Sequence, residues 1–270
     1  MRELLVRTVS GAVLVAVLVT CALVSPWAWA ALALVVVTVG TFEMGRLQQI
    51  HPSSLSVFGI LLSMTAFSVA ALVGLEVLSV KWLLLELLLL LFPFLMALFS
   101  TSCDFRQIAS FCYGSMAYLV MPCALTVFMY RNSLFGDLAG ARLIILVFAL
   151  LWTNDTFAFL TGRLLGKHKL FPRISPGKTI EGSLGGLLLT VAGAMLFSHY
   201  TSWLPMKEAV GMALIAVVCG TLGDLCESML KRQAGVKDSG KLIPGHGGIL
   251  DRFDSVMFTV PFVFVYLLWL

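Results

Sequence analysis

The chain has 270 residues, of which 60% are hydrophobic and 12% charged, with a formal net charge of +4 and a mean hydropathy of +1.00. Soluble domains carry about 25% charged and about 45–50% apolar residues, so this composition excludes a soluble globule, a disordered chain and a disulfide scaffold. It predicts an all-α, polytopic membrane protein, since its continuous apolar runs lack the alternation of an outer-membrane barrel. The mild charge gives no indication of nucleic-acid binding.

Nine apolar runs follow one another along the chain, and each is long enough to cross a membrane as a helix of about 20 residues. Their approximate ranges are 4–25, 27–47, 55–75, 79–98, 108–130, 141–162, 182–200, 208–230 and 252–270. The first run follows Met1-Arg2-Glu3 and resembles a secretion signal, but it is longer than the apolar segment of about 7–15 residues in such signals. We therefore expect it to stay as a spanning helix. Pro93 and Pro122 lie inside runs and predict kinks.

The Lys and Arg residues are unevenly distributed between the two ends of these runs. If the N-terminus is cytoplasmic, four of the 18 lie outside, namely Lys81, Arg131, Arg142 and Lys207, and the other 14 lie on the cytoplasmic side. Positive residues accumulate in cytoplasmic loops, so this distribution predicts a cytoplasmic N-terminus, an odd number of spans and a C-terminus outside. We expect a multi-pass protein of the inner (plasma) membrane.

Two loops on the predicted cytoplasmic side, 163–181 and 231–252, hold ten of the 18 positive residues. Membrane orientation requires only charge, whereas these loops also contain Gly, Pro, His and Asp at particular spacings. We therefore predict that residues 141–270 carry the functional region, with its site at the cytoplasmic membrane face. Residues 1–140 are predicted to form a scaffold of transmembrane helices that could also serve dimerisation.

Acidic residues inside apolar runs are informative, because a charge at the bilayer centre costs at least about 2.5–3.5 kcal/mol. Glu43 and Glu86 are each isolated in otherwise plain apolar runs, which favours a structural polar contact or a position near the interface. Asp155 lies in the polar segment WTNDT at 152–156. Its helix face continues into the first basic loop, which favours a functional role.

The eighth run ends in a polar helix face. Asp224, Glu227, Ser228 and Lys231 have relative offsets of 0, 3, 4 and 7, which place two acids, a hydroxyl and an ammonium on one side of a helix. Taken alone, this pattern is also compatible with a buried ion network that satisfies itself within the helix.

A second acidic pair, Asp251 and Asp254, opens the ninth run, where carboxylates are also suited to simple helix capping. Together, however, the two runs offer carboxylates at the same membrane face, joined by a Gly-rich connection that contains Lys and Arg. Such carboxylates bind Mg²⁺ along with substrate phosphates, basic side chains bind phosphate oxygens, and glycines let backbone N–H groups approach an anion. The combination predicts phosphoryl or nucleotidyl transfer onto a lipid phosphate.

These segments resemble the signature of the phosphatidate cytidylyltransferases, or CDP-diacylglycerol synthases. The resemblance rests on three stretches, SMLKR at 228–232, KDSG at 237–240 and PGHGGILDRFD at 244–254. A fourth stretch, SPGKTIEG at 175–182, is similar to a second conserved segment of that family. The resemblance covers about the last 120 residues of the 270, and the earlier residues match only in being apolar. Two positions depart from the pattern, Phe159 in place of a frequent Tyr and Cys226 in place of a frequent aromatic residue.

The resemblance implies that CTP and phosphatidic acid react to give CDP-diacylglycerol and pyrophosphate for phospholipid biosynthesis, with Mg²⁺ as cofactor. A second cation and a homodimer are compatible with it, and membrane lipids would surround the protein. On this basis the catalytic residues are assigned as Asp224, Asp251, Lys231 and His246. The leading Mg²⁺ ligands are Asp224 and Asp251, with Asp254 and Glu227 as further ligands or supports. The residues assigned to substrate phosphates are Ser175, Lys178, Thr179, Arg232, Lys237, Gly247, Gly248 and Arg252, and those assigned to support are Asp155 and Ser228.

Three other classes of protein fit parts of the pattern. An intramembrane aspartyl protease would use Asp155 with Asp224, but Thr221 replaces the first Gly of its usual Gly-x-Gly-Asp context. A polyprenyl-transferase would use paired Asp-rich motifs, and only the pair at 251 and 254 has the required spacing. A transporter for an anionic lipid or nucleotide would use intramembrane acids and cytoplasmic bases along a path, whereas the polar residues here gather at one face.

Overall fold

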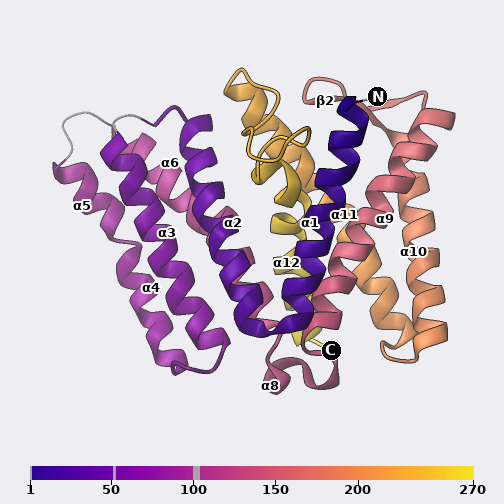
Figure 1. The fold of residues 1–270 in the computed structure, drawn as a ribbon, viewed down its shortest axis with the longest axis horizontal. Coiled ribbons are helices and arrows are strands. Elements are labelled where there is room, and N and C mark those ends of the chain that lie inside the picture. The colour runs from indigo at the N-terminus through magenta and orange to yellow at the C-terminus, as the bar shows by residue number, and fades with distance from the viewer. Residues whose placement is uncertain (1, 51–52, 100–103) are drawn as a thin grey trace.

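The computed structural model describes residues 2–50, 53–99 and 104–270, which are mostly helical (Figure 1). The first half contains α1 (Arg2–Val24), α2 (Pro26–Leu47), α3 (Ser53–Gly74), η1 (Val80–Leu83), α4 (Leu84–Leu89), α5 (Phe92–Phe99), α6 (Phe105–Ser115), η2 (Met116–Val120), α7 (Met121–Phe128), α8 (Asn132–Phe135) and η3 (Gly136–Leu138). The second half contains α9 (Ala141–Leu165), the strands β1 (Lys169–Phe171) and β2 (Ser175–Thr179), α10 (Ile180–Thr201), α11 (Met206–Gln233) and α12 (Leu250–Leu268).

Eight helical segments in the described part of the chain are long and apolar enough to cross a membrane. They correspond to the first eight predicted runs. The ninth run corresponds to α12, whose first two turns contain Asp251, Arg252 and Asp254 and are therefore less apolar. The predicted all-α, polytopic class is confirmed, and the count of nine spans stays a prediction.

The helices are irregular at Pro93 and Pro122, the two prolines for which the sequence predicted kinks. The run at 79–98 is divided into η1, α4 and α5, and Pro93 lies in the first turn of α5, where a missing N–H removes no helical bond. In the run at 108–130, η2 is a π-helical turn directly before α7, which contains Pro122. A wider turn makes room for a proline ring, which clashes with the preceding turn of a regular α-helix.

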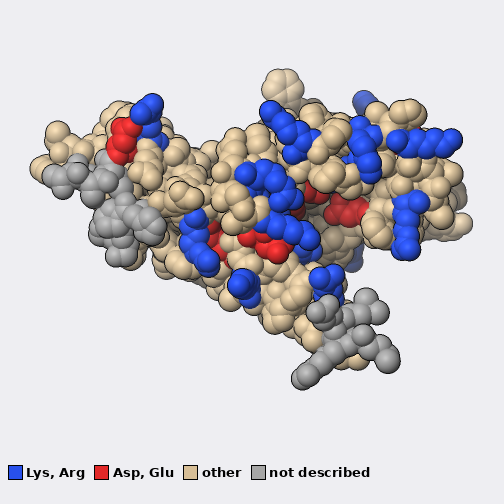
Figure 2. Space-filling view, turned by 90° about the horizontal axis from the view of Figure 1, so that it is seen from above, with Lys and Arg blue, Asp and Glu red and all other residues tan. Residues whose placement is uncertain are grey.

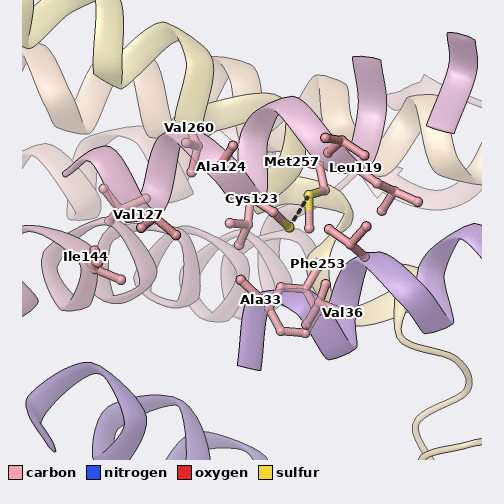
Figure 3. Packing of buried hydrophobic residues seen from close by; sticks show 14 of the residues in the cluster. Ala33, Val36, Leu119, Cys123, Ala124, Val127, Ile144, Phe253, Met257 and Val260 are labelled. Carbon is pink, nitrogen blue, oxygen red and sulfur yellow. Dashed lines mark hydrogen bonds between the residues drawn. The ribbon is translucent and has the colours of Figure 1, made fainter. Parts of the chain in front are cut away.

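Helix α12 connects the two halves of the molecule, because it packs along α11 and also against α7 and α2. Met257 of α12 lies beside Cys123 of α7, Phe253 of α12 lies beside Val36 of α2, and all four are buried (Figure 3). Lipid tails are as apolar as these side chains, so close van der Waals packing holds this contact together. The division of the chain at residue 140 stays a prediction, since α12 contacts both parts.

The chain ends lie at opposite ends of the helix bundle (Figure 1), which is the arrangement that an odd number of crossings produces. Seen from the end where the N-terminus lies, Lys and Arg side chains gather on the surface, with acidic side chains recessed among them (Figure 2). The β1–β2 hairpin and the loop at 234–249 also lie at this end, which we call the charged end. Its assignment to the cytoplasm stays a prediction.

Candidate active site

A cavity of about 560 Å³ lies between α9, the β1–β2 hairpin, α11 and the start of α12. The predicted site residues that line it are Asp155, Ser175, Lys178, Thr179, Asp224, Lys231, Asp251, Arg252 and Asp254. The two basic loops, which are far apart in the sequence, therefore contribute to one cavity.

The β1–β2 hairpin positions Lys178 at this cavity. Its strands pair antiparallel with Lys169 opposite Thr179, and the Thr179 Oγ1 accepts a hydrogen bond of 3.1 Å from the Gly182 N–H at the start of α10. A Cβ atom at Gly162 would come within 2.9 Å of Thr179 Oγ1, so α9 passes the hairpin closely only because that residue is glycine. Thr179 thus caps α10 and fixes the backbone from which Lys178 extends.

Lys178 and Asp224 form an ion pair across the cavity. The Lys178 Nζ lies 2.5 Å from the Asp224 Oδ2, and the Ser228 hydroxyl donates to the Asp224 Oδ1 at 3.2 Å. The two side chains of the pair are 26% and 32% exposed, so water reaches both and the pair is weak. An anion that binds Lys178, or a cation that binds Asp224, can therefore open it.

Lys231 joins α11 to α12 at a more buried position. Its Nζ lies 2.6 Å from the Asp251 Oδ1 and also forms an ion pair with Glu227, one helical turn earlier. The Glu227 and Asp251 side chains are only 1% and 4% exposed. Two buried carboxylates of this kind require a cation, so the ammonium fixes the relative position of the helices.

Asp251 is held by hydrogen bonds from its own loop. Its Oδ2 accepts from the Gly248 N–H at 2.7 Å, the Ser239 N–H at 2.9 Å and the Ser239 hydroxyl at 3.0 Å. Gly247 has a φ of +85°, and a Cβ atom there would overlap the Asp251 carboxylate. In this structure the glycines at 247 and 248 therefore enclose a carboxylate of the protein, and neither lines the cavity.

The four residues predicted as metal ligands divide into two pairs. Among the described residues, no group of three or more His, Cys, Asp or Glu side chains is arranged to hold a metal ion. Glu227 and Asp251 share Lys231, and the Asp251 carboxylate is further occupied by hydrogen bonds from its loop although it lines the cavity. Asp224 and Asp254 also line the cavity and have fewer contacts within the protein. Two carboxylates completed by substrate phosphate oxygens suit Mg²⁺. Asp224 and Asp254 therefore fit this ion better than the buried pair does.

Besides the two glycines, three predicted residues of the second loop do not line the cavity, namely His246, Arg232 and Lys237. The His246 Nδ1 lies 2.8 Å from the Ser10 hydroxyl of α1. Arg232 donates from Nη1 to the Val236 carbonyl oxygen at 3.0 Å, and Lys237 is exposed. The structure thus leaves the side chains of Arg232 and Lys237 exposed outside the cavity and places His246 against the first helix.

His246 is electrostatically suited to this packing role. Partial burial lowers the pKa of His246 below its usual value, and the positive charges of Arg252 and Arg7 lower it further. The imidazole is therefore neutral at pH 7. The Ser10 hydroxyl, which contacts this ring, donates a hydrogen bond of 2.9 Å to the Pro244 carbonyl oxygen. Together these contacts fasten the tip of the loop to α1.

Several residues near the site were not assigned to it from the sequence. Glu43 of α2 and Ser239 contact the loop around Asp251, and Ser10 contacts its tip. The buried hydroxyl of Tyr118, in the π-helical turn, has no hydrogen-bond partner among the described residues, and it interacts electrostatically with Asp254. The isolation of Glu43 in an apolar run was a signal of importance, but nothing in the sequence indicated its partner.

The chain matches the model of the cytidylyltransferase family over residues 5–270, and it belongs to this family. Among the relatives it matches are proteins named phosphatidate cytidylyltransferase from Staphylococcus epidermidis, Staphylococcus haemolyticus and Staphylococcus aureus. The S. epidermidis protein is 43% identical and the S. haemolyticus protein 46% identical, each over 165 residues. The S. aureus protein is 42% identical over 161 residues. Each match covers 59% of this chain and 59% of the relative, so the chain spans just under three fifths of the length of these relatives.

Proposed function

We propose that this protein is a phosphatidate cytidylyltransferase, which transfers CMP from CTP to phosphatidic acid and releases pyrophosphate. The observation that carries the proposal is the cavity at which the hairpin, α11 and the start of α12 bring Lys178, Asp224, Arg252 and Asp254 together. Family membership and the names of the relatives support the same reaction.

The chemistry requires two anionic phosphates to meet. An oxygen of the lipid phosphate attacks the α-phosphorus of CTP, a new P–O bond forms, and the bond to the β-phosphate breaks so that pyrophosphate leaves. The lipid phosphate is already an anionic nucleophile and needs no strong base, but two unit charges 4 Å apart repel by about 4 kcal/mol at an effective dielectric constant of 20. Lys178 and Arg252 at the cavity supply positive charge that offsets this repulsion.

The proposal includes Mg²⁺, held by Asp224 and Asp254. Its chemical contribution when bound would be to neutralise phosphate charge and stabilise the leaving pyrophosphate. Lys231 keeps Asp251 and the start of α12 in place, and Ser228 orients the Asp224 carboxylate by a hydrogen bond. A second cation remains part of the proposal because Asp155 also lines the cavity.

We further propose that the charged end faces the cytoplasm from the plasma membrane. The distribution of Lys and Arg supports this orientation, and CTP would reach the cavity from the cytoplasm while phosphatidic acid arrives from the membrane. We also propose a homodimer that forms through the N-terminal helices, and this part of the proposal rests on the sequence alone.

The direct test is a product assay on the purified protein in detergent with CTP and phosphatidic acid, with Mg²⁺ or with a chelator. We expect CDP-diacylglycerol and pyrophosphate in equal amounts, and only when Mg²⁺ is present. No product from a monodisperse, lipid-supplemented sample would exclude the proposal. Flux of lipid or nucleotide across vesicles without any product would favour the transporter, and prenyl transfer would favour the polyprenyl-transferase.

Lys178→Ala is expected to raise the KM for one of the two substrates by about 10–100-fold, since one charge-assisted hydrogen bond to a phosphate contributes about 1.5–3 kcal/mol. The KM for the other substrate should change less, because one ammonium group contacts the phosphates of one substrate most closely. Initial rates measured over a matrix of CTP and phosphatidic acid concentrations give both constants.

The matched control is Lys169→Ala, which removes the same charge from the other strand of the hairpin, away from the cavity lining. It should leave both KM values near those of the wild type. If Lys178→Ala also leaves both constants unchanged, the hairpin serves only as an orientation signal.

A further inference from the structure

Helix α12 begins without a capping side chain of its own. The residue at its N-cap position is Ile249, which has no polar group to accept from the first backbone N–H groups. Glu43 of α2 takes this role from 206 residues away: its Oε1 accepts from the Ile249 N–H at 3.0 Å and its Oε2 accepts from the Leu250 N–H at 2.9 Å. A carboxylate at a helix N-terminus also interacts favourably with the helix dipole.

The same carboxylate is connected to Asp251 through one hydroxyl group. The Ser239 Oγ lies 2.9 Å from the Glu43 Oε2 and 3.0 Å from the Asp251 Oδ2. All three side chains are buried, with Glu43 only 3% exposed. Because Asp251 in turn binds Lys231, a continuous set of polar contacts runs from α2 to the wall of the cavity.

The loop is shaped to admit this carboxylate. A Cβ atom at Gly240 or at Gly248 would overlap the Glu43 side chain, so both positions are glycine where the backbone passes closest to it. The loop therefore encloses two carboxylates, Asp251 from α12 and Glu43 from α2. An apolar residue in place of Glu43 would leave the N–H groups of residues 249 and 250 buried and unpaired.

We infer that Glu43 is a positioning residue for the proposed nucleotidyl transfer, a statement that rests on the proposed function. It sets the start of α12 and the loop at 234–249, so that Asp251 and Lys231 keep their orientation at the cavity. The N-terminal half thus contributes to turnover through the Glu43 carboxylate as well as through the apolar packing on α12.

Glu43→Gln tests this role with a side chain of the same size. It replaces one carboxylate oxygen by an NH₂ group, which faces backbone donors instead of accepting from them. We expect kcat to fall by about 10–100-fold, as for other residues that orient catalytic groups, with little change in either KM. Hydrogen exchange of the amides at 249 and 250 should become faster, and the melting temperature should fall by a few degrees, because a buried unpaired donor costs about 1–3 kcal/mol.

Glu86→Gln is the matched control, because Glu86 is another solitary acid in an apolar run and lies outside the cavity of the site. It should change neither kcat nor the exchange of the amides at 249 and 250. Ser239→Ala removes only the bridging hydroxyl, and its loss of kcat should be smaller and not additive with that of Glu43→Gln.

Wild-type exchange at residues 249 and 250 in Glu43→Gln would overturn the proposal. Faster exchange with wild-type kcat would also overturn it, since Glu43 would then be a helix cap and no more. If Glu43→Gln does not fold, Ser239→Ala decides: wild-type kcat refutes the connection and reduced kcat supports it. The exchange measurement needs no substrate, so it is separate from a failure of the proposed reaction, in which the wild type itself gives no product.

Discussion

Asp224→Asn is expected to reduce Mg²⁺-dependent turnover by at least about 1,000-fold, because charge stabilisation by a bound metal contributes several kcal/mol and each 1.4 kcal/mol is tenfold in rate. The substitution keeps the shape of the side chain, and the hydrogen bond from Ser228 can be retained. The substitution removes the ion pair between Lys178 and Asp224. That pair is partly exposed, so the folded protein should lose only about 0–1 kcal/mol of stability. Steady-state rates across a Mg²⁺ titration, with a thermal melt of each sample, measure both quantities.

Asp238→Asn is the control for this prediction. Asp238 is an exposed acid of the loop that follows α11 and does not line the cavity, so its loss should leave the rate and the Mg²⁺ dependence unchanged. Turnover by Asp224→Asn within a few-fold of the wild type would remove Asp224 from the proposed metal site and leave Asp254 and Asp155 as its remaining acidic candidates.

The structure distinguishes two acids that the sequence ranks equally. Asp224 and Asp251 both open onto the cavity, but Asp224 has two polar contacts and Asp251 has four. Replacing Asp251 by Asn would therefore disturb the loop and its lysine as well as any bound cation. A loss of activity in that variant is informative only beside a measurement of its stability.

The fold class follows from the sequence because it depends on local properties. The length of each apolar run and the absence of alternation determine that the chain forms spanning helices, and these features need no knowledge of partners. The meeting of the two basic loops was also predictable in outline. Both loops were assigned to the same membrane face from the Lys and Arg distribution.

The partners of individual side chains could not be predicted, because they depend on how helices far apart in the sequence are arranged. The spacing of Asp224, Glu227, Ser228 and Lys231 suggested one helix face with one function. In the structure this face is divided, since Asp224 pairs with Lys178 of the hairpin, whereas Lys231 pairs with Asp251 of α12 and with Glu227. A rotation of α11 about its axis by a fraction of a turn would change which neighbouring element each of these side chains contacts. The spacing of the residues along the sequence does not specify that rotation.

The packing partner of His246 could not be predicted from the sequence either. Glycines on both sides suggested that it had little to pack against, yet it lies against Ser10 of α1 with a lowered pKa. The first helix is distant in the sequence and carries no recognisable motif. A catalytic assignment of His246 stays a prediction, and its position against α1 makes an anchoring role the simpler expectation.

Lys231→Met is expected to have the largest combined effect on stability and turnover. It leaves Glu227 and Asp251 buried without their cation, and breaking a buried ion pair in this way lowers the free energy of unfolding by about 3–5 kcal/mol. Turnover should be lost as well, because Lys231 connects α11 to the start of α12 at the cavity. The melting temperature of the purified protein in detergent and the rate of CDP-diacylglycerol formation are the two measurements.

A second substitution separates the two effects. In the background of Lys231→Met, Glu227→Gln removes one of the two negative charges that have become unpaired, so part of the lost stability should return. Turnover should not return, because Asp251 would still lack the ammonium that orients its Oδ1. Recovery of both stability and turnover in the double variant would mean that Lys231 only neutralises Glu227. A wild-type melting temperature for Lys231→Met alone would contradict the buried ion pairs of Lys231 with Glu227 and Asp251.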